Sequence, residues 1–233
     1  KLDMVTITHP HADHISDIGN FDVLSPRVLS RLKHLTEQEI RKANRAEDRA
    51  VLDKYFEINN RYSVPIKKEN NPKLAENNGG VSFHTFEDTS TSKDNINNHC
   101  LVTVIEYLSC KILFPGDIET AAWRSLLQNQ SFISVLNGVD ILIASHHGRE
   151  SGYFGDIFQY FTPKLTVISD GRFVDTSATS RYSEKSGGWT IRHRDNSKPS
   201  EERNCVTTRN DGHIDIEIGK NDNGRAYISI TVD

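Results

Sequence analysis

The chain has 233 residues, of which 36% are hydrophobic, and a formal net charge of −4 at pH 7. A chain of this length and apolar content can bury a substantial core, and we expect one domain over residues 1–233. The acidic balance argues against a general nucleic-acid binder that depends on an overall basic surface. No apolar run approaches the roughly 18 residues that a membrane-spanning helix needs, so we expect no membrane segment.

The first predicted element is a buried strand over residues 2–8, which are mainly apolar or β-branched. It runs into the sequence THPHADHI, where His9, His11, Asp13 and His14 follow the pattern H-x-H-x-D-H. Imidazole nitrogen and carboxylate oxygen are good ligands for zinc and also suit manganese. Side chains two positions apart point the same way in an extended chain, so His9 and His11 can share one ion. Asp13 and His14 can then face a second ion.

A long helix is predicted next, at about residues 36–58. Thr36 and Glu39 form the pattern of a capping box at its start. Charged residues cover most of its surface and its apolar stripe is thin. We therefore expect a peripheral helical insertion, preceded by a strand-like connection at 21–30, and interpret the helix as a solvated cover or partner surface.

Two later strands each end in side chains that can bind metal. Residues 111–114 form an apolar strand, and Asp117 follows the Pro-Gly turn after it. Residues 141–144 form another, which ends in the pair His146 and His147. A carboxylate at Asp117 can bridge two ions, one oxygen to each. Either feature alone is a common structural turn, but three strand ends with His and Asp ligands in one chain indicate a metal site.

The remaining segments predict ordinary core and surface elements. A helix is expected from residue 118, an apolar helical stripe at 154–161 and a hairpin of strands at 213–218 and 226–232. The three cysteines, Cys100, Cys110 and Cys205, lack C-x-x-C spacing. They indicate reduced packing residues of a cytoplasmic protein instead of a disulfide framework.

The order of these motifs resembles the metallo-β-lactamase superfamily. Within it, the chain is most similar to the metallo-β-lactamase-like domain of ComEC-type competence proteins and their stand-alone relatives. The blocks that carry this resemblance span most of the chain: THPHADHI, FPGDIE, SHHGRES, PKLTVISDG (163–171) and VTTRNDGHIDIEI (206–218). The resemblance implies an α/β fold of the αββα sandwich type, two divalent ions (Zn²⁺ or Mn²⁺) and hydrolysis of phosphodiesters in DNA or RNA.

Two departures from the family pattern stand out. Family members begin with two or three strands before the metal motif, whereas this sequence starts only eight residues before His9, so we expect that N-terminal strands are missing from it. The second departure concerns the third histidine of the first metal site, which in the family usually precedes the Gly-Asp strand. His99, Asn98 or water alone completes that site, and Cys100 takes the place of the usual serine. His84 is a further candidate, although its alternating strand context favours an ordinary strand histidine.

The resemblance also implies roles for the site residues. Two ions bridged by Asp117 would activate a water molecule, and Asp13 would bind the second ion and orient the nucleophile. Either His146 or His147 completes the shell of that ion, and the other contacts the leaving oxygen or a phosphate. We name Asp13 and His147 as the catalytic pair, with Thr8 and Asp17 as candidates to hold the imidazoles.

Substrate recognition is predicted from basic residues. The segment 172–209 carries eight basic and five acidic residues, and in this branch it passes close to the mouth of the site. Arg192 and Arg194 of this segment, together with Arg149 after the histidine pair, are expected to bind a nucleic-acid backbone. The alternative for the segment is a solvated loop.

Three other functions stay open. One is a small-molecule phosphoester or lactone hydrolase of the same fold, which a substrate-sized pocket would favour. Another is a non-catalytic module of a larger defence or signalling assembly, completed by a partner protein or a missing domain. The third is a structural zinc protein, which is least favoured because structural sites prefer closed, cysteine-rich shells.

Overall fold

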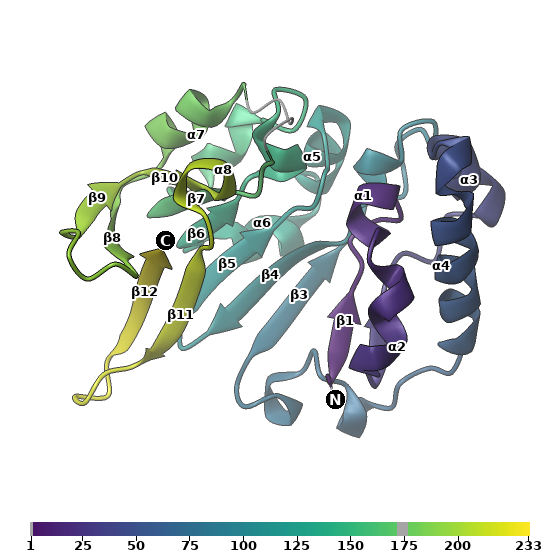
Figure 1. The fold of residues 1–233 in the computed structure, drawn as a ribbon, viewed down its shortest axis with the longest axis horizontal. Helices are drawn as coiled ribbons and strands as arrows, with labels where there is room; N and C mark the ends of the chain where they lie inside the picture. Colours follow the sequence, from purple (N-terminus) through teal and green to yellow (C-terminus); the bar gives the residue numbers. More distant parts are fainter. Residues whose placement is uncertain (1, 172–176) are drawn as a thin grey trace.

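The computed structural model describes residues 2–171 and 177–233 of the chain. It is a mixed α/β structure built around a six-stranded sheet of order β10-β7-β6-β5-β4-β3 (Figure 1). These strands are, in that order, Cys205–Thr207, Leu165–Ile168, Ile141–Ile143, Cys110–Phe114, Val102–Tyr107 and Ser82–Phe86. The strands expected at 111–114 and 141–144 are therefore confirmed, and His84 lies in a strand as its context indicates.

Four neighbouring strands of this sheet share one direction. β10, β7, β6 and β5 pair in parallel, while β4 is antiparallel to both β5 and β3. The carboxyl ends of the four parallel strands consequently lie along the same edge of the sheet, where sites are built in α/β proteins.

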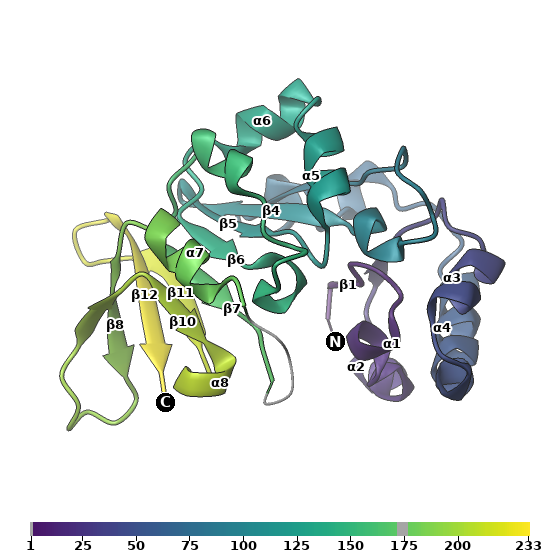
Figure 2. The same cartoon turned by 90° about the horizontal axis from the view of Figure 1, so that it is seen from above.

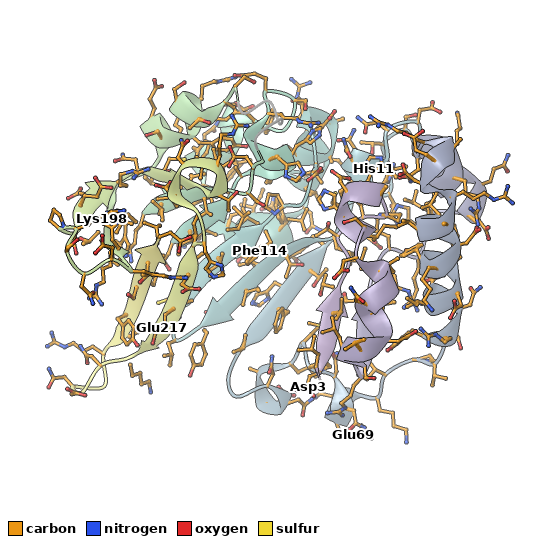
Figure 3. The ribbon with its side chains drawn as sticks, viewed as in Figure 1. Asp3, His11, Glu69, Phe114, Lys198 and Glu217 are labelled. Atoms are coloured by element: carbon orange, nitrogen blue, oxygen red, sulfur yellow. The ribbon has the colours of Figure 1, made fainter. Side chains whose placement is uncertain are left out.

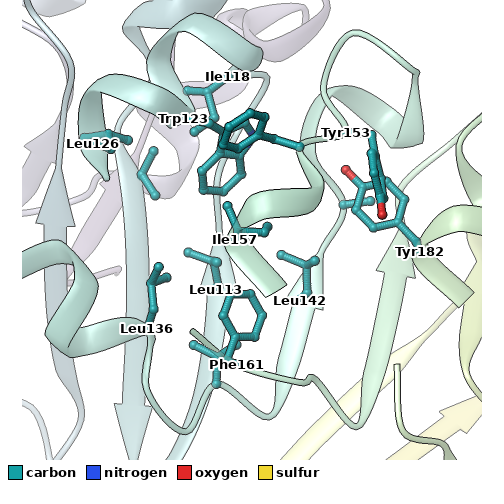
Figure 4. Close-up of a cluster of buried hydrophobic side chains, with 14 of the residues drawn as sticks. Leu113, Ile118, Trp123, Leu126, Leu136, Leu142, Tyr153, Ile157, Phe161 and Tyr182 are labelled. Atoms are coloured by element: carbon teal, nitrogen blue, oxygen red, sulfur yellow. The ribbon is translucent and has the colours of Figure 1, made fainter. Parts of the chain in front are cut away.

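Both faces of the central sheet are covered. One face packs against α5 (Thr120–Leu126), α6 (Gln130–Leu136), the 3₁₀ turn Gly155–Gln159 and α7 (Thr179–Lys185), as Figure 2 shows. Alternation along β5 sends Leu113 into this helical side, where Figure 4 shows it among buried side chains. The adjacent Ile112 points to the opposite face.

A second sheet covers that opposite face. Its order is β11-β12-β8-β9, formed by Asp215–Lys220, Ala226–Val232, Trp189–His193 and Glu201–Arg203. β11 and β12 pair in antiparallel register, which confirms the expected hairpin. Ile191, Ile230 and Val232 are completely buried against the central sheet.

An N-terminal lobe, residues 2–62, has its own apolar cluster. Its strands β1 (Met4–Thr6) and β2 (Val28–Ser30) pair in parallel, and its helices are α1 (Ala12–Ile15), α2 (Phe21–Leu24), α3 (Glu37–Ala43) and α4 (Arg49–Arg61). The lobe joins the central sheet where Leu101 N–H donates to the Thr8 carbonyl oxygen at 2.8 Å, just before β4 begins.

The lobe departs from the sequence predictions at several points. The capping box of Thr36 and Glu39 is present, but the predicted helix is interrupted at Asn44, whose φ of −110° and ψ of 164° are extended. α4 buries Leu52, Tyr55, Phe56 and Ile58 and is thus well packed in the lobe. The strand-like connection at 21–30 contains α2 before β2 begins.

Elsewhere the structure bears on two further predictions. The apolar stripe at 154–161 forms a 3₁₀ turn between loops instead of an α-helix. All three cysteines are buried and free, as expected for packing residues. Among the helices of residues 2–171 and 177–233, none is both long and apolar enough to cross a membrane.

Candidate metal centre

Four side chains from three separate strand ends meet at the edge of the central sheet. Asp13, His14, Asp117 and His147, here called the four-residue cluster, each offer a ligand atom, and these atoms lie within 4.8 Å of one another. His14 Nε2 is 3.1 Å from Asp117 Oδ2, and His147 Nε2 is 3.5 Å from the same oxygen. Imidazole and carboxylate donors in this number and spacing fit a divalent zinc or manganese ion.

The central sheet places one half of this cluster. Asp117 follows β5 and His147 follows β6, and these parallel neighbours end at the same edge. The peptide units are tied together because His146 N–H donates to the Gly116 carbonyl oxygen at 3.1 Å. His147 Nδ1 lies 2.8 Å from the Ser169 carbonyl oxygen after β7, so Nδ1 carries a proton and Nε2 faces the carboxylates.

The backbone at this second strand end is strained. His146 and His147 both adopt left-handed conformations, with φ of 49° and 57°, and Gly148 follows at φ 75°. Non-glycine residues rarely adopt positive φ, and such strain concentrates at functional sites. Because of this turn, the imidazole rings of His146 and His147 contact different residues.

Charges within the cluster are strongly coupled. Burial alone would raise the pKa of Asp117, but hydrogen bonds from His14 and His147 outweigh it and hold that pKa far below its ordinary value. The contacts of His147 with Asp117 and Asp13 raise its own pKa to about 10, and the contact with His147 lowers the pKa of Asp13 to about 2. Both carboxylates are therefore ionised, and the protonated His147 imidazole balances part of their charge; a divalent ion that binds here would displace that proton.

His9 and His11 lie beside the four-residue cluster, and the His9 ring centroid is 4.2 Å from that of His14. His9 Nε2 is 3.0 Å from His11 Nδ1 and 3.9 Å from Asp117 Oδ2. Burial lowers the pKa of His9 to about 3 and also lowers that of His11, so both rings are neutral and keep lone pairs for a cation. The structure thus brings His9, His11, Asp13, His14, Asp117 and His147 together, as the sequence predicts.

His146 is held differently from His147. Arg149 Nη1 donates to His146 Nε2 at 2.9 Å, so the proton of the neutral ring sits on Nδ1. Nδ1 lies 3.2 Å from Glu119 Oε1 and 2.9 Å from Ser151 Oγ. His146 Nε2 is 3.9 Å from Asp117 Oδ2, the same distance as His9 Nε2, but this nitrogen already accepts a hydrogen bond from Arg149. Of the predicted pair, His147 is the member in the four-residue cluster.

His99, a predicted ligand of the first ion, is engaged in other contacts. Its ring nitrogens lie 3.0 Å from the Asp88 carbonyl oxygen and 3.3 Å from that of Ser92. Asn98 is also occupied, because its Oδ1 accepts from Glu119 N–H before α5. Asn97, which the sequence analysis did not single out, lies against His11, and its Oδ1 is buried without a partner among the described residues.

A second residue missed from the sequence fixes the metal motif itself. Asn44, at the break between α3 and α4, accepts from Ala12 N–H at 2.9 Å and donates to the Pro10 carbonyl oxygen at 3.0 Å. The extended backbone at Asn44 is what allows this side chain to reach the loop. Closer to the site, Thr8 Oγ1 lies 3.3 Å from His9 Nδ1, in the supporting role predicted for it.

The predicted basic residues separate into two groups. Arg149 lies beside the centre through its contact with His146. Arg192 and Arg194 lie instead on and just after β8, on the opposite side of the molecule from α1 (Figure 1). Arg194 pairs with Asp215 and Asp233 there. Residues 172–176 of the predicted basic segment lie outside the described residues.

His84 also lies outside the centre, because it pairs with Glu106 across the β3–β4 ladder.

Comparison with models of known protein families finds no match, and comparison with curated proteins finds none either.

Proposed function

We propose that the chain is a metal-dependent phosphodiesterase that holds two divalent ions, Zn²⁺ or Mn²⁺, and cleaves DNA or RNA. The observation that carries this proposal is the four-residue cluster, with His9 and His11 beside it and His9 Nε2 3.9 Å from the same Asp117 oxygen that His14 and His147 approach. A structural zinc site would be a closed shell of four ligands, whereas here five other side chains that can bind metal gather around Asp117.

Each residue of the centre has its own proposed role. His9 and His11 would hold one ion, His14 and His147 the other, and Asp117 would bridge them. Such ions supply Lewis acidity, which activates water and neutralises charge on a phosphoryl group. The Asp13 side chain is 67% exposed, so one oxygen can orient an incoming water molecule while the other faces His147.

As the finer description of the fold we propose an αββα sandwich of the metallo-β-lactamase type. Helices cover one face of the central sheet and a second sheet covers the other. The metal motif reaches the edge of the central sheet from the N-terminal lobe.

The proposal is tested by metal analysis and cleavage together. Protein purified without chelator is measured for metal content and then assayed with added Mn²⁺ or Zn²⁺. The substrates are labelled single-stranded DNA, double-stranded DNA, RNA and bis(4-nitrophenyl) phosphate. The variant His147→Gln is compared with the wild type, and His213→Gln, an exposed histidine beside Asp215, is the matched control.

Two bound ions and cleavage that is lost in His147→Gln but kept in His213→Gln are the expected results. Cleavage of the small diester without cleavage of any nucleic acid would replace this proposal with the small-molecule hydrolase. Bound metal with no cleavage of any substrate would replace it with a non-catalytic module.

A further inference from the structure

A hollow of about 410 Å³ opens directly beside the candidate metal centre. One wall is the metal motif, residues 11–13, and the opposite wall is the end of α3, residues 43–45. Asp48 and Arg149 complete the lining. A substrate that reaches the centre through this hollow therefore touches both the central sheet and the N-terminal lobe.

Arg149 is the first cation on this route. Its Nη1 donates to His146 Nε2, and its Nε is buried with no partner. Among the residues that the structure describes, no carboxylate pairs with this guanidinium. An arginine charge held in place without a counter-ion suits a phosphate, which accepts hydrogen bonds in the fork geometry of the guanidinium.

Arg45 is the second cation, on the facing wall. Its side chain is 82% exposed, and its nearest carboxylate is the exposed Glu47 at 3.5 Å. Exposed pairs of this kind are weak, so Arg45 can exchange Glu47 for another anion. The backbone position is nevertheless fixed, because the preceding Asn44 binds Ala12 and Pro10 of the metal motif.

The route continues beyond Arg45. A second hollow of about 430 Å³ is lined by Arg41, Arg45 and Arg49, with Glu37 at its side. Arg41 is bound to Glu37 and Asp53, whereas Arg49 is 82% exposed and lies 3.9 Å from Asp53. Arg45 lines both hollows, so Arg149, Arg45 and Arg49 follow one another away from the centre.

We propose that this series of arginines binds the phosphate backbone of a single nucleic-acid strand. Arg149 contacts the phosphate next to the metal centre, Arg45 the following one, and Arg49 a phosphate farther along the α3–α4 junction. The proposal rests on the proposed function and assigns its substrate path to the N-terminal lobe, in place of the β8 region that the sequence predicted. A repeating row of cations favours a polymer over a small phosphoester.

The test measures strand binding separately from cleavage. A fluorescein-labelled, phosphorothioate-linked oligothymidylate is titrated with the metal-loaded full chain at several salt concentrations, and anisotropy gives the dissociation constant. Arg45→Ala and Arg49→Ala are each expected to weaken binding about threefold to tenfold and to reduce the salt slope by roughly 0.7. Arg225→Ala, an exposed arginine in the β11–β12 turn, is the matched control.

Metal content is measured on every variant, because Arg45 and Arg49 contact none of the metal-binding side chains and should leave it unchanged. Arg149→Lys, which keeps the charge but loses the fork, should bind the oligonucleotide less tightly than the wild type. Equal affinity and equal salt slope for wild type, Arg45→Ala, Arg49→Ala and Arg225→Ala would overturn the proposal, even if the chain cleaves DNA. Failure of all cleavage, with strand binding still dependent on Arg45, would overturn the proposed function alone.

Discussion

The two halves of the candidate metal centre are positioned by different means. Asp117 and His147 come from the ends of adjacent parallel strands, so the backbone ladder and the core behind it set their separation. The half that carries His9 to His14, here called the motif loop, lies between β1 and the end of the short helix α1 in the N-terminal lobe. That loop is held by single contacts, chiefly the Asn44 side chain and the Leu101 N–H.

This difference indicates where the centre is robust and where it is sensitive. A strand end is supported by many backbone hydrogen bonds, so no one side chain away from the site controls it. The motif loop depends on a few polar contacts, each worth about 1 kcal/mol. Substitutions far from the centre should therefore disturb His9 to His14 more readily than Asp117 and His147.

The largest effect is expected from Asp117→Ala, which removes the carboxylate shared by both halves. Without it, four imidazoles and Asp13 remain with no bridging group. We expect metal content to fall from two ions to one or none, and cleavage to fall about a thousandfold or more, which is about 4 kcal/mol of activation free energy. Elemental analysis and phosphodiester hydrolysis measure these quantities, with Asp222→Ala in the β11–β12 turn as the control. Two retained ions would show that Asp117 is not the bridge.

A smaller effect is expected from Asn44→Ala, which releases the motif loop but removes no ligand. Residues that orient ligands typically change metal affinity 10- to 100-fold, and we expect a loss in this range. Asn44→Asp keeps the acceptor for Ala12 N–H but not the donor to Pro10, so its affinity should lie between Ala and wild type. Competition with a chromogenic chelator measures the affinity. Wild-type affinity in Asn44→Ala would mean that the loop does not depend on this contact.

The contrast between the halves also explains what the sequence could predict. The ends of strands can be recognised from local sequence, because an apolar run followed by Asp117 or by His146 and His147 is visible without knowledge of the tertiary structure. The break at Asn44 is not visible, since residues 36–58 have helical propensity throughout and the extended backbone is stabilised by contacts with Pro10 and Ala12. Propensity was overridden there by tertiary hydrogen bonds.

The choice between the two adjacent histidines, likewise, depended on backbone geometry. Consecutive left-handed residues have no reliable sequence signal outside glycine, so the direction of each ring could not be inferred. The path past Arg45 could not be predicted from the sequence for a related reason. It joins residues 45 and 149, which only the packing of the lobe against the sheet brings to one hollow.

An intermediate effect on metal affinity, weaker than that of Asn44→Ala, is expected from Gly116→Ala at the junction of the two halves. Gly116 has φ +63°, and an added Cβ would lie 3.0 Å from Cys100 Sγ and 3.2 Å from Thr8 Cβ. Strain and crowding should lower the free energy of unfolding by about 1–3 kcal/mol and move Thr8, which lies against His9. Metal affinity should fall severalfold. Gly138→Ala, at φ +78° with open space around its Cβ, controls for backbone strain alone; an equal loss of metal affinity there would exclude crowding at the junction as the cause.

The smallest effect on metal content is expected from His99→Gln, and it is the most direct test of the sheet-and-loop comparison. His99 is fully buried, and its nitrogens lie near the carbonyl oxygens of Asp88 and Ser92. Its replacement should leave two ions bound, while the free energy of unfolding falls by about 1–3 kcal/mol because a buried polar group loses its partners. Chemical denaturation and elemental analysis measure the two quantities on the same sample. Loss of one ion with little loss of stability would instead assign His99 to the first metal site, and the segment before β4 would then belong to the centre as a third contributor beside the motif loop and the sheet.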